Sequence, residues 1–315
     1  MFMRPLAVTN QMNALTEKGL APVHHGFAIS RRNTPRFPVT IILGLICENG
    51  IVLASDSRTT NPDGTFSDGT QKIYEIGLNE VERFLVATAG HADLGARAIE
   101  ILSGLAWGKS LTDYRTVADL VQQAVTALKA EIRQQFSGTA EELQKHFRDY
   151  HFELVAAHYF AGKPFIFSMD FEIGIVVRDR GHCVARGCGR MLAEFCLHGI
   201  DVSKMKHMEA YATAAFAVEE VKKIDSRCGG PLQLALCWAQ KQETPGQLSE
   251  TRHFTCAILE RTAWTSMIVE EINKLSGDVN ERWKRQTTQV IEGVSRKLEE
   301  FMARYAEHAD PRSDS

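Results

Sequence analysis

The sequence predicts a layered α+β domain in which antiparallel sheets are covered by helices. Three observations predict this fold class. The chain has 315 residues, of which 44% are hydrophobic, enough for one large core or two smaller ones. Strand-like and helix-like segments come in separate blocks along the chain. Short turn signals join neighbouring strand-like segments, as in antiparallel hairpins.

The first block of strands follows a polar, irregular segment. Residues 1–38 end in a stretch with two prolines and three arginines, which disfavours regular structure. We expect this segment to be a leader or a linker. Residues 40–47 and 50–56 are apolar, β-branched runs joined by Glu48-Asn49, and they predict a hairpin. Residues 84–89 predict another strand.

Two helices and further strands are expected next. Apolar residues recur three and four positions apart in residues 94–107 and 117–135, which is the period of an amphipathic helix. A third helix is expected over residues 205–221. The remaining expected strands are residues 152–160, 165–169, 173–177, 182–185, 233–238 and 254–259.

The C-terminal part differs in composition from the rest of the chain. From Ser266 onward the sequence is more charged, while apolar residues keep a helical spacing as far as Phe301. The spacing is interrupted at Ser276-Gly277-Asp278. We expect a helix or a helix pair that packs on its own domain or on a neighbouring subunit, and the alternative is a helix that docks a separate partner.

Composition and charge exclude several classes of protein. Lys and Arg number 36 against 39 Asp and Glu, a net charge of −3, which argues against nucleic acid as a partner. No apolar run approaches the roughly 20 residues that cross a membrane, and the N-terminus lacks the apolar core of a secretory signal, so we expect a cytoplasmic protein. The seven cysteines form no CxxC pair, so we expect reduced thiols, no metal site and no cofactor.

The candidate chemistry lies around the first hairpin. The sequence contains no GxSxG, GxxxxGK[ST], HExxH or GxGxxG motif. Thr40 begins the first expected strand, and Gly44 lies within it. Asp56 is the last residue of the second expected strand and the first of the segment Asp-Ser-Arg-Thr-Thr. Lys72 follows a turn that is rich in Gly, Asp, Asn and Pro. These residue types at these offsets resemble the proteasome β-subunit family, which includes bacterial proteasome-type proteins and consists of N-terminal nucleophile hydrolases.

The resemblance extends beyond the hairpin. Ala89-Gly90 is similar to the family's oxyanion loop, and Asp225-Ser226-Arg227-Cys228-Gly229-Gly230 is similar to its D-S-x-S-G-G motif. The resemblance implies a four-layer αββα sandwich of two antiparallel sheets with an extra C-terminal helical tail. It divides the chain into a leader of residues 1–39, a hydrolase domain of residues 40–260 and a helical extension of residues 261–315.

The resemblance also implies a role for each matching residue. Thr40 is the expected nucleophile, and its own α-amine is the base, because the pKa of such an amine, about 8, suits neutral pH. Lys72 is expected to stabilise the alkoxide, and Asp56 is expected to keep Lys72 protonated and oriented. The backbone N–H of Gly90 is expected to bind the oxyanion. Asp225 would help to orient Thr40.

This sequence departs from the family at three positions. Cys188 and Cys228 stand where active members usually carry serines beside the threonine. A thiol is a weaker hydrogen-bond donor and acceptor than a hydroxyl, so proton relay through Cys228 is expected to be slower, unless both thiols are simply small buried residues. Val39 stands where precursors usually have glycine, and its β-branch, with Pro38 before it, crowds the carbonyl that self-cleavage must attack.

The substrate pocket implied by the resemblance carries no charge. It would be lined by Thr59, Thr70, Tyr74 and Thr88, and we expect a preference for uncharged side chains.

We therefore expect a threonine-type peptidase that exposes Thr40 by self-cleavage and hydrolyses peptides or unfolded proteins inside a homo-oligomeric ring. The alternatives are a catalytically silent structural subunit and a small-molecule amidase of the same superfamily. Ring size and any regulatory ATPase partner leave no signal in the sequence.

Overall fold

The computed structural model of the chain describes residues 40–60, 65–80, 82–179, 181–241, 252–258, 292–293, 295–297 and 299–300. The expected leader, residues 1–39, lies outside the described residues. Of the expected C-terminal extension, only the short stretches between residues 292 and 300 are described, and these are helical.

The first sheet has five antiparallel strands in the order β10-β1-β2-β11-β12. The predicted hairpin forms its centre and is almost wholly buried, because its residues are apolar on both faces of the sheet. Ile42 of β1 lies opposite Ser55 of β2, so the start of one strand adjoins the end of the other. The strands are β1 (Ile41–Ile46), β2 (Gly50–Ser55), β10 (Cys183–Gly187), β11 (Gln233–Lys241) and β12 (Arg252–Ile258).

The second sheet also has five antiparallel strands, in the order β5-β6-β7-β8-β9. Between the two sheets the chain passes through a small ribbon, β3 (Thr59–Thr60) paired with β4 (Phe66–Ser67). The strands of the second sheet are β5 (Ile73–Gly77), β6 (Arg83–Gly90), β7 (Phe152–Phe160), β8 (Lys163–Asp170) and β9 (Ile175–Asp179).

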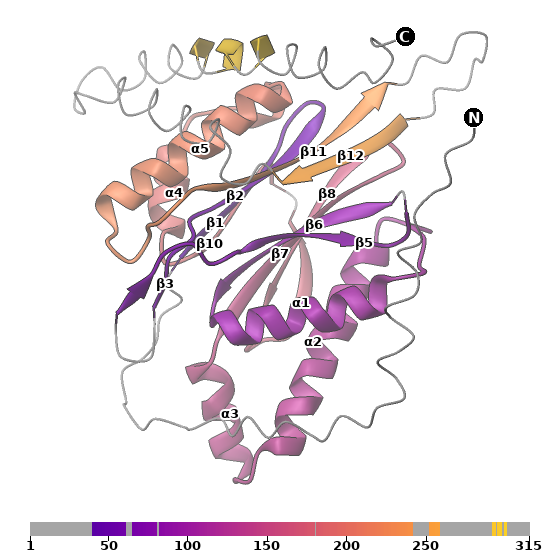
Figure 1. The fold of residues 1–315 in the computed structure, drawn as a ribbon, viewed down its shortest axis with the longest axis vertical. Helices are drawn as coiled ribbons and strands as arrows, with labels where there is room; N and C mark the ends of the chain where they lie inside the picture. Colours follow the sequence, from indigo (N-terminus) through magenta and orange to yellow (C-terminus); the bar gives the residue numbers. More distant parts are fainter. Residues whose placement is uncertain are drawn as a thin grey trace, which may run out of the picture. The chain divides into compact units, whose positions relative to one another are not determined.

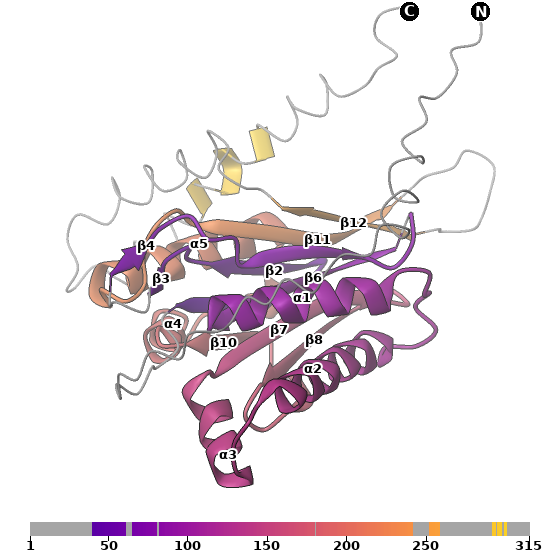
Figure 2. The same cartoon turned by 60° about the horizontal axis from the view of Figure 1, so that its bottom comes forward.

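Helices cover the outer face of each sheet, and the two sheets pack on each other (Figures 1 and 2). Helices α4 (Arg190–Cys196) and α5 (His207–Ile224) lie on the first sheet. Helices α1 (Ala92–Ala106) and α2 (Thr116–Gln135) lie on the second. Three apolar clusters fill the spaces between the four layers. The predicted αββα sandwich of two antiparallel sheets is therefore confirmed.

Some elements have weaker sequence signals than the rest. Helix α3 (Ala140–Asp149) was not expected because it is short and mostly charged, and only Leu143 and Phe147 carry large apolar side chains toward the core. A capping box of Thr139 and Glu142 starts it. Helix α4 has only seven residues, which is too short for a clear period. The third predicted helix begins at His207, later than expected, because Met205 and Lys206 have extended backbone: Met205 ends the 3-10 turn of Val202–Lys204, and Lys206 is the N-cap of α5.

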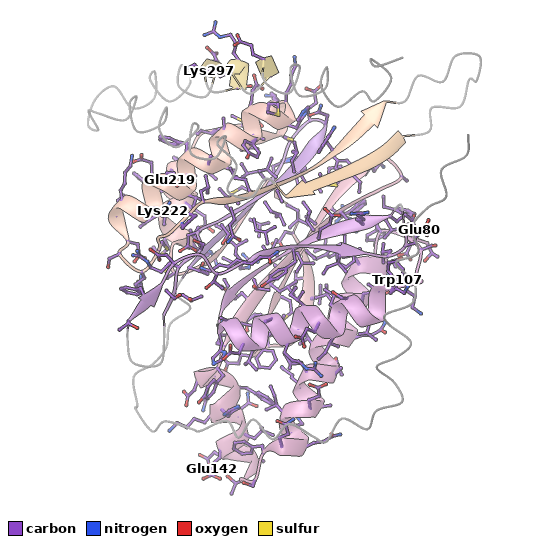
Figure 3. All side chains as sticks on the ribbon, in the orientation of Figure 1. Glu80, Trp107, Glu142, Glu219, Lys222 and Lys297 are labelled. Atoms are coloured by element: carbon purple, nitrogen blue, oxygen red, sulfur yellow. The ribbon has the colours of Figure 1, made fainter. Side chains whose placement is uncertain are left out.

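Helix α5 is buried on most of its surface, and this includes two carboxylates. Glu219 pairs with Lys222 (Figure 3) through atoms 2.6 Å apart. Glu220 pairs with Lys223 at the same distance. These ion pairs let the helix place charged residues beside an apolar sheet. Among the described residues no helix has the length and apolar character that a membrane span requires.

Candidate active site

Thr40, Asp56 and Lys72 meet where the two sheets face each other. Thr40 immediately precedes β1 and Asp56 immediately follows β2, so the antiparallel register of this hairpin brings them together. Lys72 immediately precedes β5 of the other sheet. All three side chains are buried, with residue exposures of 0%, 0% and 4%. The fold thus unites residues that lie far apart in sequence.

The three side chains form a closed hydrogen-bonded set. Thr40 Oγ1 donates to Asp56 Oδ1, and Lys72 Nζ donates to Thr40 Oγ1. Lys72 Nζ also lies 2.9 Å from Asp56 Oδ1 and donates to the carbonyl of Arg58. The ammonium has three donors, and each has an acceptor here. The hydroxyl is therefore held between a cation and an anion.

Backbone amides fix the Asp56 carboxylate. Its Oδ1 accepts from the Ile41 N–H at 3.1 Å, and its Oδ2 accepts from the Gly229 N–H at 2.8 Å. Gly229 lies in the segment that resembles the D-S-x-S-G-G motif, so that loop is tied directly to the ion pair. Such contacts fix the position and orientation of the buried carboxylate.

Burial lowers the pKa of Lys72, although the adjacent Asp56 opposes that shift. Removing an ammonium from water disfavours its charged form, and a nearby carboxylate favours it. A lysine whose pKa is lowered gives up a proton more readily than a solvated one. Lys72 is thus suited both to stabilise a negative charge on Thr40 Oγ1 and to exchange a proton with it.

Gln233, which the sequence analysis treated only as a strand residue, positions Lys72. Its Oε1 accepts from the Lys72 N–H at 2.8 Å and from the Ile73 N–H at 3.3 Å. Its Nε2 donates to the Thr70 carbonyl at 2.6 Å. Gln233 starts β11 and is buried, so one side chain of the first sheet holds the backbone that carries Lys72. In the sequence, the signal that could have indicated this role is a polar amide at the start of an apolar strand.

The backbone of Thr40 lies against a pair of thiols. Its N–H donates to Cys188 Sγ at 3.3 Å, and the Cys188 thiol donates to its carbonyl at 3.3 Å. Cys228 Sγ lies 3.5 Å from Cys188 Sγ. The Thr40 carbonyl also accepts from the Gly189 N–H at 3.3 Å. The two cysteines at the family's serine positions therefore contact Thr40 or each other.

Gly187 allows this close approach. It has a φ of +86°, and a Cβ placed on it would lie 2.3 Å from the Thr40 carbonyl oxygen. Only glycine fits here without displacing Thr40.

Asp225 reaches Thr40 only through a thiol. Its carboxylate accepts from Arg227 at the backbone N–H, at Nε and at Nη2, over 3.0, 2.9 and 2.8 Å. Hydrogen bonds from Arg227 hold the pKa of Asp225 below its ordinary value, and the Cys188 thiol adds a smaller contribution of the same sign. The expected orienting role of Asp225 stays a prediction, and the contact that supports it is with Cys188.

Gly90 is required by the packing of two strands. It ends β6 with a φ of +98°, and a Cβ there would lie 2.6 Å from the His151 carbonyl and 2.9 Å from Phe152 Cα. Its assignment to the oxyanion hole stays a prediction.

The four residues of the expected pocket fall into two pairs. Thr59 Oγ1 and Thr70 Oγ1 are hydrogen-bonded at 3.0 Å, next to the segment that carries Lys72. Tyr74 packs against the apolar cluster under α1 and α2, and Thr88 faces Gly95 of α1. The pocket assignment stays a prediction.

Two clusters of described residues bring together donor atoms that could hold a metal. The first contains Cys188, Asp225 and Cys228. The second contains His151, Glu153 and Asp170. The carboxylates of both clusters accept hydrogen bonds from backbone N–H groups. Glu153 accepts from the Gly187 N–H, and Asp170 accepts from the N–H groups of the second and third residues after it in its turn.

Comparisons with known proteins agree with this fold. A family model described as proteasome subunit matches residues 39–237, more than half of the chain. Three solved structures are similar at a TM-score of 0.56, and each covers 75% of this chain. They are an Anbu (Gly-1) mutant from Hyphomicrobium sp. strain MC1 (14% identity, 95% of that chain covered), Anbu, an ancestral β-subunit, from Yersinia bercovieri (13%, 94%) and the helical assembly of the Anbu complex from Pseudomonas aeruginosa (18%, 93%). No curated protein matches the chain in sequence.

Proposed function

The chain belongs to the proteasome subunit family, and we propose that it is a threonine-type peptidase whose nucleophile is Thr40. The observation that carries the proposal is the buried set in which Lys72 and Asp56 both hydrogen-bond to Thr40 Oγ1. A threonine hydroxyl is a weak nucleophile, and an adjacent cation with a lowered pKa stabilises its alkoxide.

Peptide hydrolysis follows from this geometry in two steps. Thr40 Oγ1 attacks the carbonyl carbon of the substrate, and its proton passes to the free α-amine of Thr40, while the Lys72 ammonium stabilises the oxygen. The amine then gives the proton to the leaving nitrogen, and an ester to Thr40 remains. Water hydrolyses the ester and regenerates the hydroxyl. The N–H of Gly90 is the proposed donor to the tetrahedral oxyanion, a type of contact that contributes about 3 to 4 kcal/mol.

The α-amine of Thr40 becomes free only after the peptide bond between residues 39 and 40 is cleaved. We propose that Thr40 Oγ1 attacks the Val39 carbonyl, that the carbon–nitrogen bond breaks, and that the nitrogen takes up the hydroxyl proton. The ester formed in this N-to-O acyl shift is then hydrolysed by water, which releases residues 1–39. The β-branch of Val39 crowds the attacked carbon, so self-cleavage is expected to be slow.

Intact-mass measurement and peptide turnover test this function together. The wild type should lose residues 1–39 on prolonged incubation and should then hydrolyse fluorogenic peptides. Thr40→Ala should abolish both reactions, and Lys72→Ala should slow both by about 100-fold or more, because it removes the ammonium that stabilises the negative charge on the hydroxyl oxygen.

Lys129→Ala is the matched control, since Lys129 is a partly buried lysine whose pKa is also lowered by burial but which lies on α2. It should leave both rates unchanged. If the full mass persists in the assembled protein and no peptide is cleaved, the silent-subunit function replaces this one.

We further propose that the enzyme is a homo-oligomer that encloses its active sites and acts on short or unfolded peptides. Two groups of exposed apolar side chains support this proposal. Ile175 and Val177 on β9 are 59% and 56% exposed, and Met191 and Phe195 on α4 are 79% and 69% exposed. Similarity to a protein solved as a helical assembly adds to it.

Mass photometry should detect particles of several subunits, and a persistent monomer at micromolar concentration would contradict the chamber. The thiols of Cys47, Cys183, Cys188, Cys196 and Cys228 are not in disulfides, which supports a reducing, cytoplasmic location. The expected pocket residues carry no charge, so peptides with uncharged side chains should be cleaved faster than those with Arg or Glu.

A further inference from the structure

Two thiols and a carboxylate converge beside the backbone of Thr40. The donor atoms of Cys188, Cys228 and Asp225 all lie within 4.8 Å of one another. Cys228 is buried at 1% exposure, Cys188 is half-buried, and the Asp225 side chain is 10% exposed. The proposed peptidase reaction uses no thiol, so it does not explain why two cysteines lie at these positions.

The spacing of the two sulfurs suits a tetrahedral metal ion. Zn²⁺ binds thiolates at about 2.3 Å, and two sulfurs on one tetrahedral zinc are therefore about 3.8 Å apart. Cys188 Sγ and Cys228 Sγ are 3.5 Å apart before any metal is bound. A carboxylate oxygen is an accepted third zinc ligand, and Asp225 supplies one. Little movement is needed to form a three-ligand site.

The hydrogen-bond partners of the three groups are compatible with a bound cation. Zinc binds thiolates, so both thiols release their protons to water as the metal binds. The Thr40 N–H already donates to Cys188 Sγ at 3.3 Å, so this sulfur faces a hydrogen-bond donor. Arg227 donates three hydrogen bonds to the Asp225 carboxylate. The carboxylate has a lone pair beyond those that accept from Arg227, so it can bind a metal while it keeps its hydrogen bonds to Arg227.

We propose that Cys188, Cys228 and Asp225 form a binding site for Zn²⁺ or a similar thiophilic divalent cation, with its fourth position directed at the Thr40 nitrogen. That nitrogen lies 3.3 Å from Cys188 Sγ. In the uncut chain it is an amide and cannot bind the metal, so water fills the fourth position. After cleavage it is an amine, which the metal binds and thereby withdraws as the catalytic base. The metal is an inhibitor of the peptidase, and only this consequence rests on the proposed function.

Co²⁺ titration of the reduced, chelator-treated full chain tests the binding itself. Co²⁺ is the spectroscopic probe, since thiolate ligands give it a charge-transfer absorption in the near ultraviolet. One equivalent should bind with this absorption, and Zn²⁺ should displace it. Cys188→Ser and Cys228→Ser should each weaken the apparent affinity at least about tenfold, because even partners behind the ligands contribute that much. Both variants restore the family's usual serine, which keeps the risk of misfolding low.

Cys183→Ser is the matched control, because Cys183 is a half-buried thiol at the other end of β10. It should bind Co²⁺ as the wild type does. Equal affinity in all three variants, or binding without thiolate charge transfer, overturns the metal site.

A second measurement separates the site from the peptidase. Zn²⁺ should inhibit peptide hydrolysis by the cleaved wild type, and the Cys188→Ser/Cys228→Ser double variant should resist inhibition at the same concentration. Inhibition that is equal in both proteins overturns the proposed regulation. If the wild type binds Co²⁺ through thiolates but never cleaves peptides, the metal site is supported and the peptidase function fails.

Discussion

Thr40 has different surroundings on its two sides. Its hydroxyl faces Asp56 and Lys72, a buried ion pair 2.9 Å apart whose polar atoms have backbone partners. Its backbone N–H and carbonyl contact the Cys188 thiol, and the Cys228 thiol lies behind Cys188; these contacts are 3.3 to 3.5 Å long. Charged groups therefore contact the Thr40 hydroxyl, whereas thiols contact its backbone nitrogen and carbonyl.

The two sides of Thr40 should therefore respond differently to substitution. The ion pair is built into the fold, because removing either partner leaves an unpaired charge in the interior. The thiols are held by weaker contacts, and small residues of similar size can replace them. We therefore expect substitutions of Asp56 or Lys72 to cost stability, and substitutions of the two cysteines by small residues to change reactivity with little cost in stability.

The largest expected effect is that of Asp56→Ala. This change strands the Lys72 ammonium and leaves the N–H groups of Ile41 and Gly229 without their acceptor, at a cost of about 3 to 5 kcal/mol in unfolding free energy. The control is Asp68→Ala, which removes a pair with Arg58 whose Asp68 side chain is 43% exposed, and it should cost less than about 1 kcal/mol. Urea denaturation measures the unfolding free energy of both variants. Similar losses would contradict the expectation that the buried pair contributes more to stability than the exposed one.

Gly187→Ala tests how tightly the backbone side is packed. Its φ of +86° and the 2.3 Å approach of the added Cβ to the Thr40 carbonyl should together cost about 3 kcal/mol. Gly199→Ala is the control, because Gly199 has a φ of +80° with open space around it and should cost only about 1 kcal/mol. Thermal unfolding of both variants gives the difference, and equal losses would mean that contact with Thr40 adds nothing.

The smallest expected effect is on thiol reactivity, measured by iodoacetamide labelling and peptide mapping at pH 8. Burial raises the pKa of Cys183 to about 11, whereas the hydrogen bond from Cys228 lowers that of Cys188. The thiolate fraction at pH 8 is therefore larger for Cys188, and the lower nucleophilicity of a more acidic thiol offsets only part of this difference. Cys188 should react faster than Cys183, and its advantage should shrink as the pH rises toward 11. Faster labelling of Cys183 would contradict the assigned pKa order.

The extent to which the sequence predicted the site depends on the distance between the residues. Thr40 and Asp56 flank the two strands of one hairpin. A short turn and antiparallel pairing bring the start of the first strand next to the end of the second, so their contact follows from the local sequence. The contact with Lys72 came from the resemblance to a family. The amide of Gln233 comes from a strand far along the chain, and no local pattern indicates which backbone it holds.

By itself the sequence determined the elements with strong periodicity, because strand and helix periods are local properties. The roles expected of Thr40, Asp56 and Lys72 came from the resemblance to a family, and they stay predictions. The tertiary structure alone decided that Lys72 is buried against Asp56, that Asp225 bonds to Arg227, and that two thiols meet at the backbone of Thr40. Those contacts depend on how two sheets and the loop after α5 pack together. Packing sets distances and burial, and these in turn set the pKa of a lysine or a thiol.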